Sequence, residues 1–142
     1  MRALLDVSFL LAAFDANHVS HRVVRGWLES NIEHGWSSCA ITQNGFVRVV
    51  SQPRYPNRLT PQAAMTKLER ACSLSHHTFR PCQVSLIDRA RVNPDGVLGP
   101  SQVTDTYLLA LAVSHGDRLV TLDHRVVSGS VPNATPGHLV LV

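Results

Sequence analysis

The sequence predicts an α/β fold in which a mainly parallel sheet of four to five strands carries helices on both faces. Short apolar runs that suit buried strands alternate with longer segments whose apolar residues recur at helical spacing. This alternation implies right-handed crossovers between parallel strands. The chain has 142 residues, 44% of them apolar, which is enough for a sizeable core, so we expect a single domain over residues 1–142.

The first half of the chain is predicted to alternate twice between strand and helix. The expected elements are a strand over 2–6, a short helix from Val7 to Phe14, a helix over 19–33, a strand from Trp36 to Ile41 and a helix from Gln43 to Val50. Gly35 is a usual stop for the helix before it, and Thr42 is the candidate N-cap of the helix after it.

The second half is predicted to add three strands and three helices after a proline-containing loop from Ser51 to Leu59. The expected elements are a helix capped by Thr60, opened by Pro61 and ending near Ser75, a strand from Thr78 to Cys82, a short helix from Ser85 to Val92, a loop from Asn93 to Pro100, a helix from Asp105 to His115, and strands over Leu119–Leu122 and His138–Val142. Proline suits the first helical position because the N–H group that it lacks would have no partner there.

Three aspartates at the ends of apolar segments predict a metal-dependent site. Asp6 closes the first strand, Asp123 closes the fourth, and Asp105 opens a strongly apolar helix. The carboxyl ends of parallel strands meet at one crevice, which Asp6 and Asp123 would flank if the strand order reverses between them. Carboxylates forced together repel unless a cation is present, and hard cations such as Mg²⁺ prefer oxygen ligands. Taken singly, Asp105 could instead cap its helix and Asp123 could be a turn residue.

Charge and cysteine content restrict the function less. Twelve of the thirteen basic residues are arginine, which binds phosphate bidentately, so the net charge of +3 permits a nucleic-acid partner without requiring one. Arg48, Arg54 and Arg58, in or near the loop after the Gln43 helix, are candidate phosphate contacts. The three cysteines lack CxxC spacing, which argues against a disulfide framework or a zinc site. No apolar run approaches the roughly 20 residues that span a bilayer, so we expect a cytoplasmic protein without a membrane segment.

Four segments in order resemble those of PIN-domain ribonucleases: LLDVSFLLAAFD, ITQNGFVRVVS, VTDTYLLALAVSHG and RLVTLDH. Together they are most similar to VapC-type toxins of type II toxin–antitoxin pairs, and the resemblance spans nearly the whole chain. It implies a three-layer PIN-like fold and a Mg²⁺- or Mn²⁺-dependent endoribonuclease that cuts RNA in the bacterial cytoplasm. It also implies a cognate antitoxin as inhibitor and a homodimeric toxin.

The resemblance also implies which residues form the site. PIN domains usually place four acids there, and Asp6, Asp105 and Asp123 match the first, third and fourth as metal ligands and catalytic residues. The second is normally a glutamate just after a threonine, and Gln43 stands at that position. An amide carries no negative charge, so we expect a weaker metal site that favours one firmly held ion over two. Ser8 and Thr121 match small polar residues that support the acids or the scissile phosphate.

Two functions therefore stay open. The first is an active nuclease, because phosphodiester hydrolysis needs an activated water and a neutralised phosphate, and a carboxylate-held Mg²⁺ supplies both. The second is a catalytically weak or inactive PIN-fold module that lost activity through the change at Gln43 and binds RNA or a protein partner. A metal titration combined with a cleavage assay separates the two.

Overall fold

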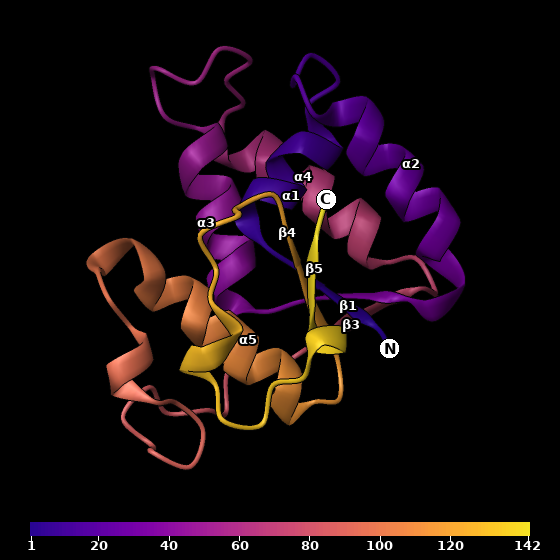
Figure 1. Ribbon diagram of the computed structural model, residues 1–142. Helices are drawn as coiled ribbons and strands as arrows, with labels where there is room; N and C mark the ends of the chain where they lie inside the picture. The colour runs from indigo at the N-terminus through magenta and orange to yellow at the C-terminus, as the bar shows by residue number, and fades with distance from the viewer.

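A computed structural model describes residues 1–142 and shows a five-stranded sheet between two layers of helices (Figure 1). The strands are β1 (Ala3–Leu5), β2 (Trp36–Ser38), β3 (His77–Phe79), β4 (Arg118–Thr121) and β5 (Leu139–Leu141). Their order is β3-β2-β1-β4-β5, and every neighbouring pair is parallel. The predicted parallel sheet is confirmed, and its order reverses between β1 and β4, where a crevice for a site is expected.

Helices cover both faces of this sheet, as the sequence predicted. The helices are α1 (Val7–Phe14), α2 (His21–Asn31), α3 (Ala40–Val50), α4 (Pro61–Cys72) and α5 (Val103–Ser114), and short 3-10 turns lie at Ile32–His34, Pro94–Gly96, Pro100–Gln102, Ser128–Ser130 and Pro136–His138. One apolar cluster packs helices α1, α2, α3 and α4 against one face of the sheet. A second cluster packs α5 against the other face. The alternation of side chains along β1 feeds both clusters, because Leu5 enters the first and Leu4 the second.

The start of α3 differs from the prediction. Cys39 is the N-cap and α3 begins at Ala40, so β2 stops at Ser38 and does not reach Ile41. Thr42 is the third helical residue, and its hydroxyl accepts the Cys39 N–H at 3.0 Å. The prediction of Thr42 as the N-cap is wrong. A capping box has two side chains, one at the N-cap and one at the third helical position, and Thr42 takes the second position.

The predicted helix from Ser85 to Val92 is also wrong, because the segment forms turns. Val92 is its only buried side chain, so a helix there would have no apolar face to bury. The Asp88 carboxylate instead accepts the Ala90 N–H at 2.9 Å, a local contact that competes with helical hydrogen bonding. Elsewhere, Thr60 caps α4 as predicted, with its hydroxyl accepting the Ala63 N–H at 3.1 Å.

Other boundaries shift by a few residues. The helix expected over 19–33 is α2 followed by the 3-10 turn Ile32–His34, and α4 ends at Cys72 where Ser75 was predicted. Helix α5 begins at Val103, so Asp105 lies in its first turn and does not open it. The three cysteines are free thiols. None of the helices has both the length and the apolar character needed to cross a membrane.

Candidate functional site

Asp6 lies where β1 passes directly into α1, and it is 7% exposed. Its Oδ1 accepts the Val7 N–H at 2.6 Å, and its Oδ2 accepts the hydroxyls of Ser8 and Thr121, each at 2.8 Å. A carboxylate has about four acceptor positions, so these contacts leave one on Oδ1. The carboxylate is therefore held in one orientation and keeps some capacity to bind a cation.

The hydroxyls of Ser8 and Thr121 connect the ends of β1 and β4. They lie 3.3 Å apart, and each also accepts a backbone N–H, from Leu122 at 3.3 Å and from Asp123 at 3.0 Å respectively. The structure thus places both predicted supporting residues in contact with Asp6. This small network sets the position of the chain that leads from β4 to Asp123.

Asp105 faces this network from the first turn of α5. Burial, the charge of Asp6 and then the charge of Asp123 raise its pKa from the usual 3.8 to about 6, while Arg125 acts in the opposite direction. No hydrogen bond contributes to that pKa, so both carboxylate oxygens stay available. The three predicted acids therefore share one electrostatic field. They do not form a ready-made cage, because no three His, Cys, Asp or Glu side chains lie close enough to hold one ion.

The Asp123 carboxylate is paired with Arg125. The Arg125 Nε lies 2.9 Å from Oδ1 and 3.2 Å from Oδ2, and its Nη2 lies 2.6 Å from Oδ2. The backbone N–H of Arg125 donates to Oδ1 as well, at 2.9 Å. The Arg125 guanidinium lowers the pKa of Asp123 to about 2, so this acid is ionised throughout the neutral range. No sequence pattern indicated this contact between residues two positions apart.

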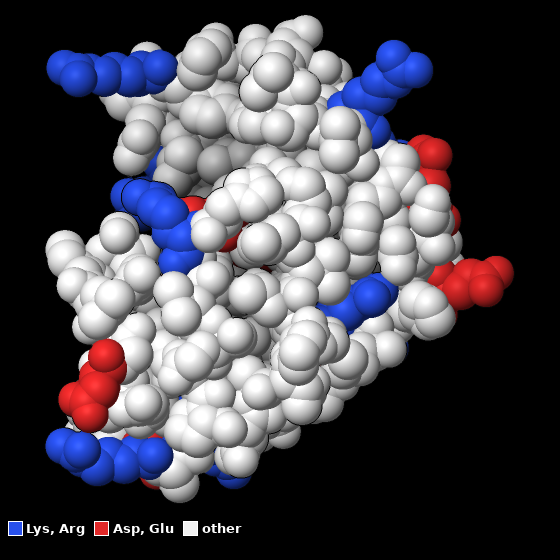
Figure 2. All heavy atoms as spheres, viewed as in Figure 1, with Lys and Arg blue, Asp and Glu red and all other residues white.

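A hollow of about 450 Å³ opens between α1, α3 and α5 beside two of the acids. Its polar lining comes from six residues: Asp6, Ser8, Asn44, Arg48, Thr104 and Asp105. Figure 2 shows acidic atoms recessed on this face of the molecule with basic side chains near them. Asn44 and Arg48 lie one helical turn apart on α3 and are exposed, so they are within reach of a ligand in the hollow.

Gln43 takes a different position from Asn44. Its amide Nε2 donates to Ser38 Oγ at 2.9 Å, and it lines a groove between α3 and α4 but not the hollow, whereas Asn44 lines both. Asn44 was not among the predicted site residues, although the spacing of apolar residues along α3 indicates which way each side of the helix faces. Thr42, Phe46 and Val50 form the buried line of α3. Gln43 lies on one side of that line, away from the hollow. Asn44 and Arg48, one helical turn apart, face the hollow.

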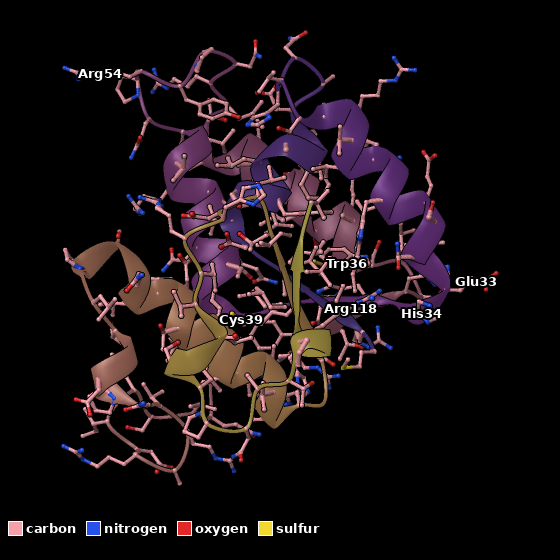
Figure 3. All side chains as sticks on the ribbon, viewed as in Figure 1. Glu33, His34, Trp36, Cys39, Arg54 and Arg118 are labelled. Atoms are coloured by element: carbon pink, nitrogen blue, oxygen red, sulfur yellow. The ribbon has the colours of Figure 1, made fainter.

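The other two arginines predicted to contact phosphates lie outside this hollow. Arg58 Nε donates to the carbonyl of Ser51 at 3.1 Å, which ties it to its own loop. Arg54 extends from the tip of that loop into solvent (Figure 3). Of the three candidates, only Arg48 lines the hollow beside the acids.

Comparison with known proteins agrees with this parallel α/β fold. A family model described as the PIN domain matches residues 3–128. The chain belongs to the PIN-domain family. It is 51% identical over 139 residues to Ribonuclease VapC44 of Mycobacterium tuberculosis, and the match covers 98% of each chain. It is 40% identical over 124 residues to Ribonuclease VapC39 of the same species, covering 87% of this chain and 89% of the relative.

A solved structure supports the same fold. The crystal structure of VapBC2 from Rickettsia felis, bound to a DNA fragment from its promoter, contains a chain that matches with a TM-score of 0.61. The sequence identity is 14%, and the match covers 100% of this chain and 98% of the other. The three-layer PIN-like fold that the sequence predicted is thus confirmed.

Gly45 allows α3 of this PIN domain to approach the start of α1, because a Cβ added there would lie 2.5 Å from Val7 Cγ2. Val7 is β-branched and directly follows Asp6, so it has little freedom to move away. We expect Gly45→Ala to lower the free energy of unfolding by about 1–3 kcal/mol, as overpacking usually does. RNA cleavage should fall as well, because Asp6 moves with Val7.

Gly26 provides the matched control for this substitution. It lies inside α2, and a Cβ added there has no heavy atom within 4 Å. Gly26→Ala should therefore raise stability by up to about 1 kcal/mol through helix propensity alone. Urea unfolding of both variants measures the two changes in the free energy of unfolding. A gain in stability for Gly45→Ala like that for Gly26→Ala would contradict the close approach of α3 to α1.

Asp105 should make the metal-free PIN domain less stable as the pH rises from about 4 to about 6. Its pKa is about 6 in the folded chain against the usual 3.8, so within this window the folded state binds more protons than the unfolded state. The cost is complete above about pH 6. Asp105→Asn should then raise the free energy of unfolding at pH 7 by about 1–2 kcal/mol, a value reduced for partial exposure.

Urea unfolding in EDTA at several pH values measures this effect. The difference between Asp105→Asn and the wild type should shrink as the pH falls and vanish below the unfolded pKa of 3.8, where the carboxyl holds its proton in both states. Asp95→Asn, a change at an exposed acid, serves as the control and should show no such window. A stability difference that is the same at every pH would rule out the electrostatic cause.

Proposed function

We propose that this PIN domain is the metal-dependent endoribonuclease toxin of a toxin–antitoxin pair. The proposal rests above all on Asp105, a partly buried carboxylate without a hydrogen bond that feels the charges of Asp6 and Asp123. Uncompensated negative charge of this kind, at the carboxyl ends of parallel strands, suits a hard divalent cation. Relatives named as VapC ribonucleases, one of them 51% identical over 98% of the chain, support RNA as the substrate.

The donor set fits Mg²⁺ or Mn²⁺. Asp105 offers two oxygens, and Asp6 offers the remaining position on Oδ1. Asn44 adds a neutral oxygen or a hydrogen-bond donor at the same hollow. A bound divalent ion would lower the pKa of a water molecule and neutralise charge on the phosphate. Gln43 is bonded to Ser38 and adds no charge, which agrees with a site that holds one ion firmly.

The chain's own groups perform the remaining tasks. Ser8 and Thr121 hold Asp6 in the orientation that its neighbours require, so little reorganisation accompanies the reaction. Asp105, with a pKa of about 6, is ionised at neutral pH, and an oxygen that holds no metal can accept a hydrogen bond from the water that attacks the phosphorus. Arg48, exposed at the hollow, would bind a non-bridging phosphate oxygen of the RNA through its guanidinium.

The partners follow from the same proposal. A VapC-type toxin acts in the cytoplasm, is held inactive by a cognate antitoxin protein, and forms a homodimer. A small reading frame for a DNA-binding antitoxin next to this gene would support the pairing. Size measurement of the purified protein in solution tests the homodimer.

RNA cleavage with controlled metal tests the function. Purified protein should cut single-stranded RNA in Mg²⁺ or Mn²⁺, stop when EDTA is added, and resume when Mn²⁺ is restored in excess. Cleavage that continues under complete chelation would exclude the metal mechanism. RNA binding without cleavage at any Mn²⁺ concentration would instead favour the second hypothesis, a PIN-fold binding module that the uncharged Gln43 left inactive.

A further inference from the structure

The guanidinium of Arg125 pairs with both oxygens of the Asp123 carboxylate. Oδ1 accepts the backbone N–H and the Nε of Arg125, and Oδ2 accepts its Nε and Nη2. Three N–H groups make these four contacts, because the single Nε–H is shared between the two oxygens, so the guanidinium covers both carboxylate oxygens. In this arrangement a positive charge already neutralises Asp123, in contrast to Asp105, which has no cationic partner bonded to it.

The side chain of Arg125 is exposed to solvent, whereas its backbone is held in place. Its backbone is held on both sides, because its N–H donates to Asp123 and its carbonyl accepts the Gln102 amide at 3.4 Å. The side chain is 69% exposed, while that of Asp123 is 21% exposed. An exposed arginine pairs only weakly with a carboxylate, so the guanidinium can exchange that partner for another anion at small cost.

We propose that Arg125 is an exchangeable cation of the site: it occupies Asp123 in the free protein and moves to an RNA phosphate when a divalent ion takes the carboxylate. The inference rests on the proposed function. Guanidinium and carboxylate match bidentately, and guanidinium and phosphate match equally well, so Arg125 loses one good partner and gains another. Arg125 is thus a positioning residue for the scissile region of the RNA.

Removal of Arg125 should have opposite effects on metal binding and on RNA cleavage. Without RNA, Arg125 competes with the metal, so its removal should strengthen metal binding. With RNA, Arg125 contributes a phosphate contact, so its removal should slow cleavage. Because the metal frees the guanidinium that RNA needs, each ligand should also strengthen the binding of the other. A side chain that only maintained the fold would change both properties in the same direction.

Calorimetric titration with Mn²⁺ and a cleavage assay at saturating Mn²⁺ test the inference on the full chain. Arg125→Gln should bind Mn²⁺ about three- to fivefold more tightly than the wild type, the size of an exposed bidentate pair. Its cleavage of single-stranded RNA should be at least about tenfold slower. Arg125→Lys keeps the charge without the fork and should fall between the two in both measurements.

Arg22→Gln is the matched control. Arg22 is an exposed arginine on α2 that belongs to none of the ion pairs, so its replacement removes the same charge and should change neither measurement. Equal Mn²⁺ affinity for Arg125→Gln and the wild type, or unchanged cleavage, would overturn the inference while leaving the proposed function intact. If neither the wild type nor Arg125→Gln binds Mn²⁺, the proposed function itself is wrong.

Discussion

Asp6→Asn is expected to reduce RNA cleavage by at least about a hundredfold while the protein stays folded. The change removes one negative charge from the field around Asp105 and weakens the metal donor set, and losses of that size follow removal of a preorganised charge. The fold should tolerate it, because the amide oxygen can still accept the Val7 N–H. The hydroxyls of Ser8 and Thr121 can turn to accept from the amide.

Single-turnover cleavage at saturating Mn²⁺ measures this effect, with circular dichroism to monitor the fold. Asp88→Asn is the matched control, because Asp88 is an exposed acid in a turn where asparagine makes the same contact with the Ala90 N–H. That variant should cleave at the wild-type rate. A folded Asp6→Asn protein with wild-type activity would remove Asp6 from the reaction.

Asp117→Ala is expected to have the largest effect on stability, a loss of about 3 kcal/mol. Asp117 is 1% exposed and accepts the Nε and Nη2 of Arg80 at 2.9 and 2.7 Å and the hydroxyl of Ser37 at 2.9 Å. Breaking a buried pair by removing one partner leaves the other charge without compensation, which costs several kcal/mol. The partial exposure of Arg80 places the expected loss at the lower end of that range.

Urea denaturation measures this loss as a lower midpoint with an unchanged slope. Glu29→Ala is the contrasting control, because Glu29 and Arg25 are both exposed and lie 4.0 Å apart, a pair worth less than about 0.5 kcal/mol. Asp117 precedes β4 and Asp123 follows it, so cleavage per folded molecule should persist in Asp117→Ala. Equal stability losses for the two variants would contradict the structural role of the buried pair.

Local sequence patterns predicted the strands and most helices because each depends on residues that are close along the chain. The apolar run before Asp6 and the run before Asp123 are short and end in an acid, which is sufficient to predict two strand ends. Thr60 followed by Pro61 predicted the start of α4 for the same reason. The parallel order then follows from the alternation of strands with helices.

Tertiary structure decided the features that depend on what a segment packs against. Residues Ser85 to Val92 have a helical composition, but they bury only Val92 and therefore form turns. The ion pair of Asp117 with Arg80 joins two residues that are 37 positions apart, and no local pattern indicates it. Its strength comes from burial, which only the folded chain provides.

The features of the candidate site also divide into those set by local sequence and those set by tertiary structure. The sequence by itself determined that Asp6, Asp105 and Asp123 lie at the ends of apolar segments, because strand ends and helix starts can be recognised locally. Only the folded chain decided that Asn44 faces the hollow, that Gln43 is bonded to Ser38, and that Arg125 pairs with Asp123. The direction of a side chain depends on neighbours brought together from distant parts of the chain, and those neighbours exist only once α1, α3, α5 and β4 have packed.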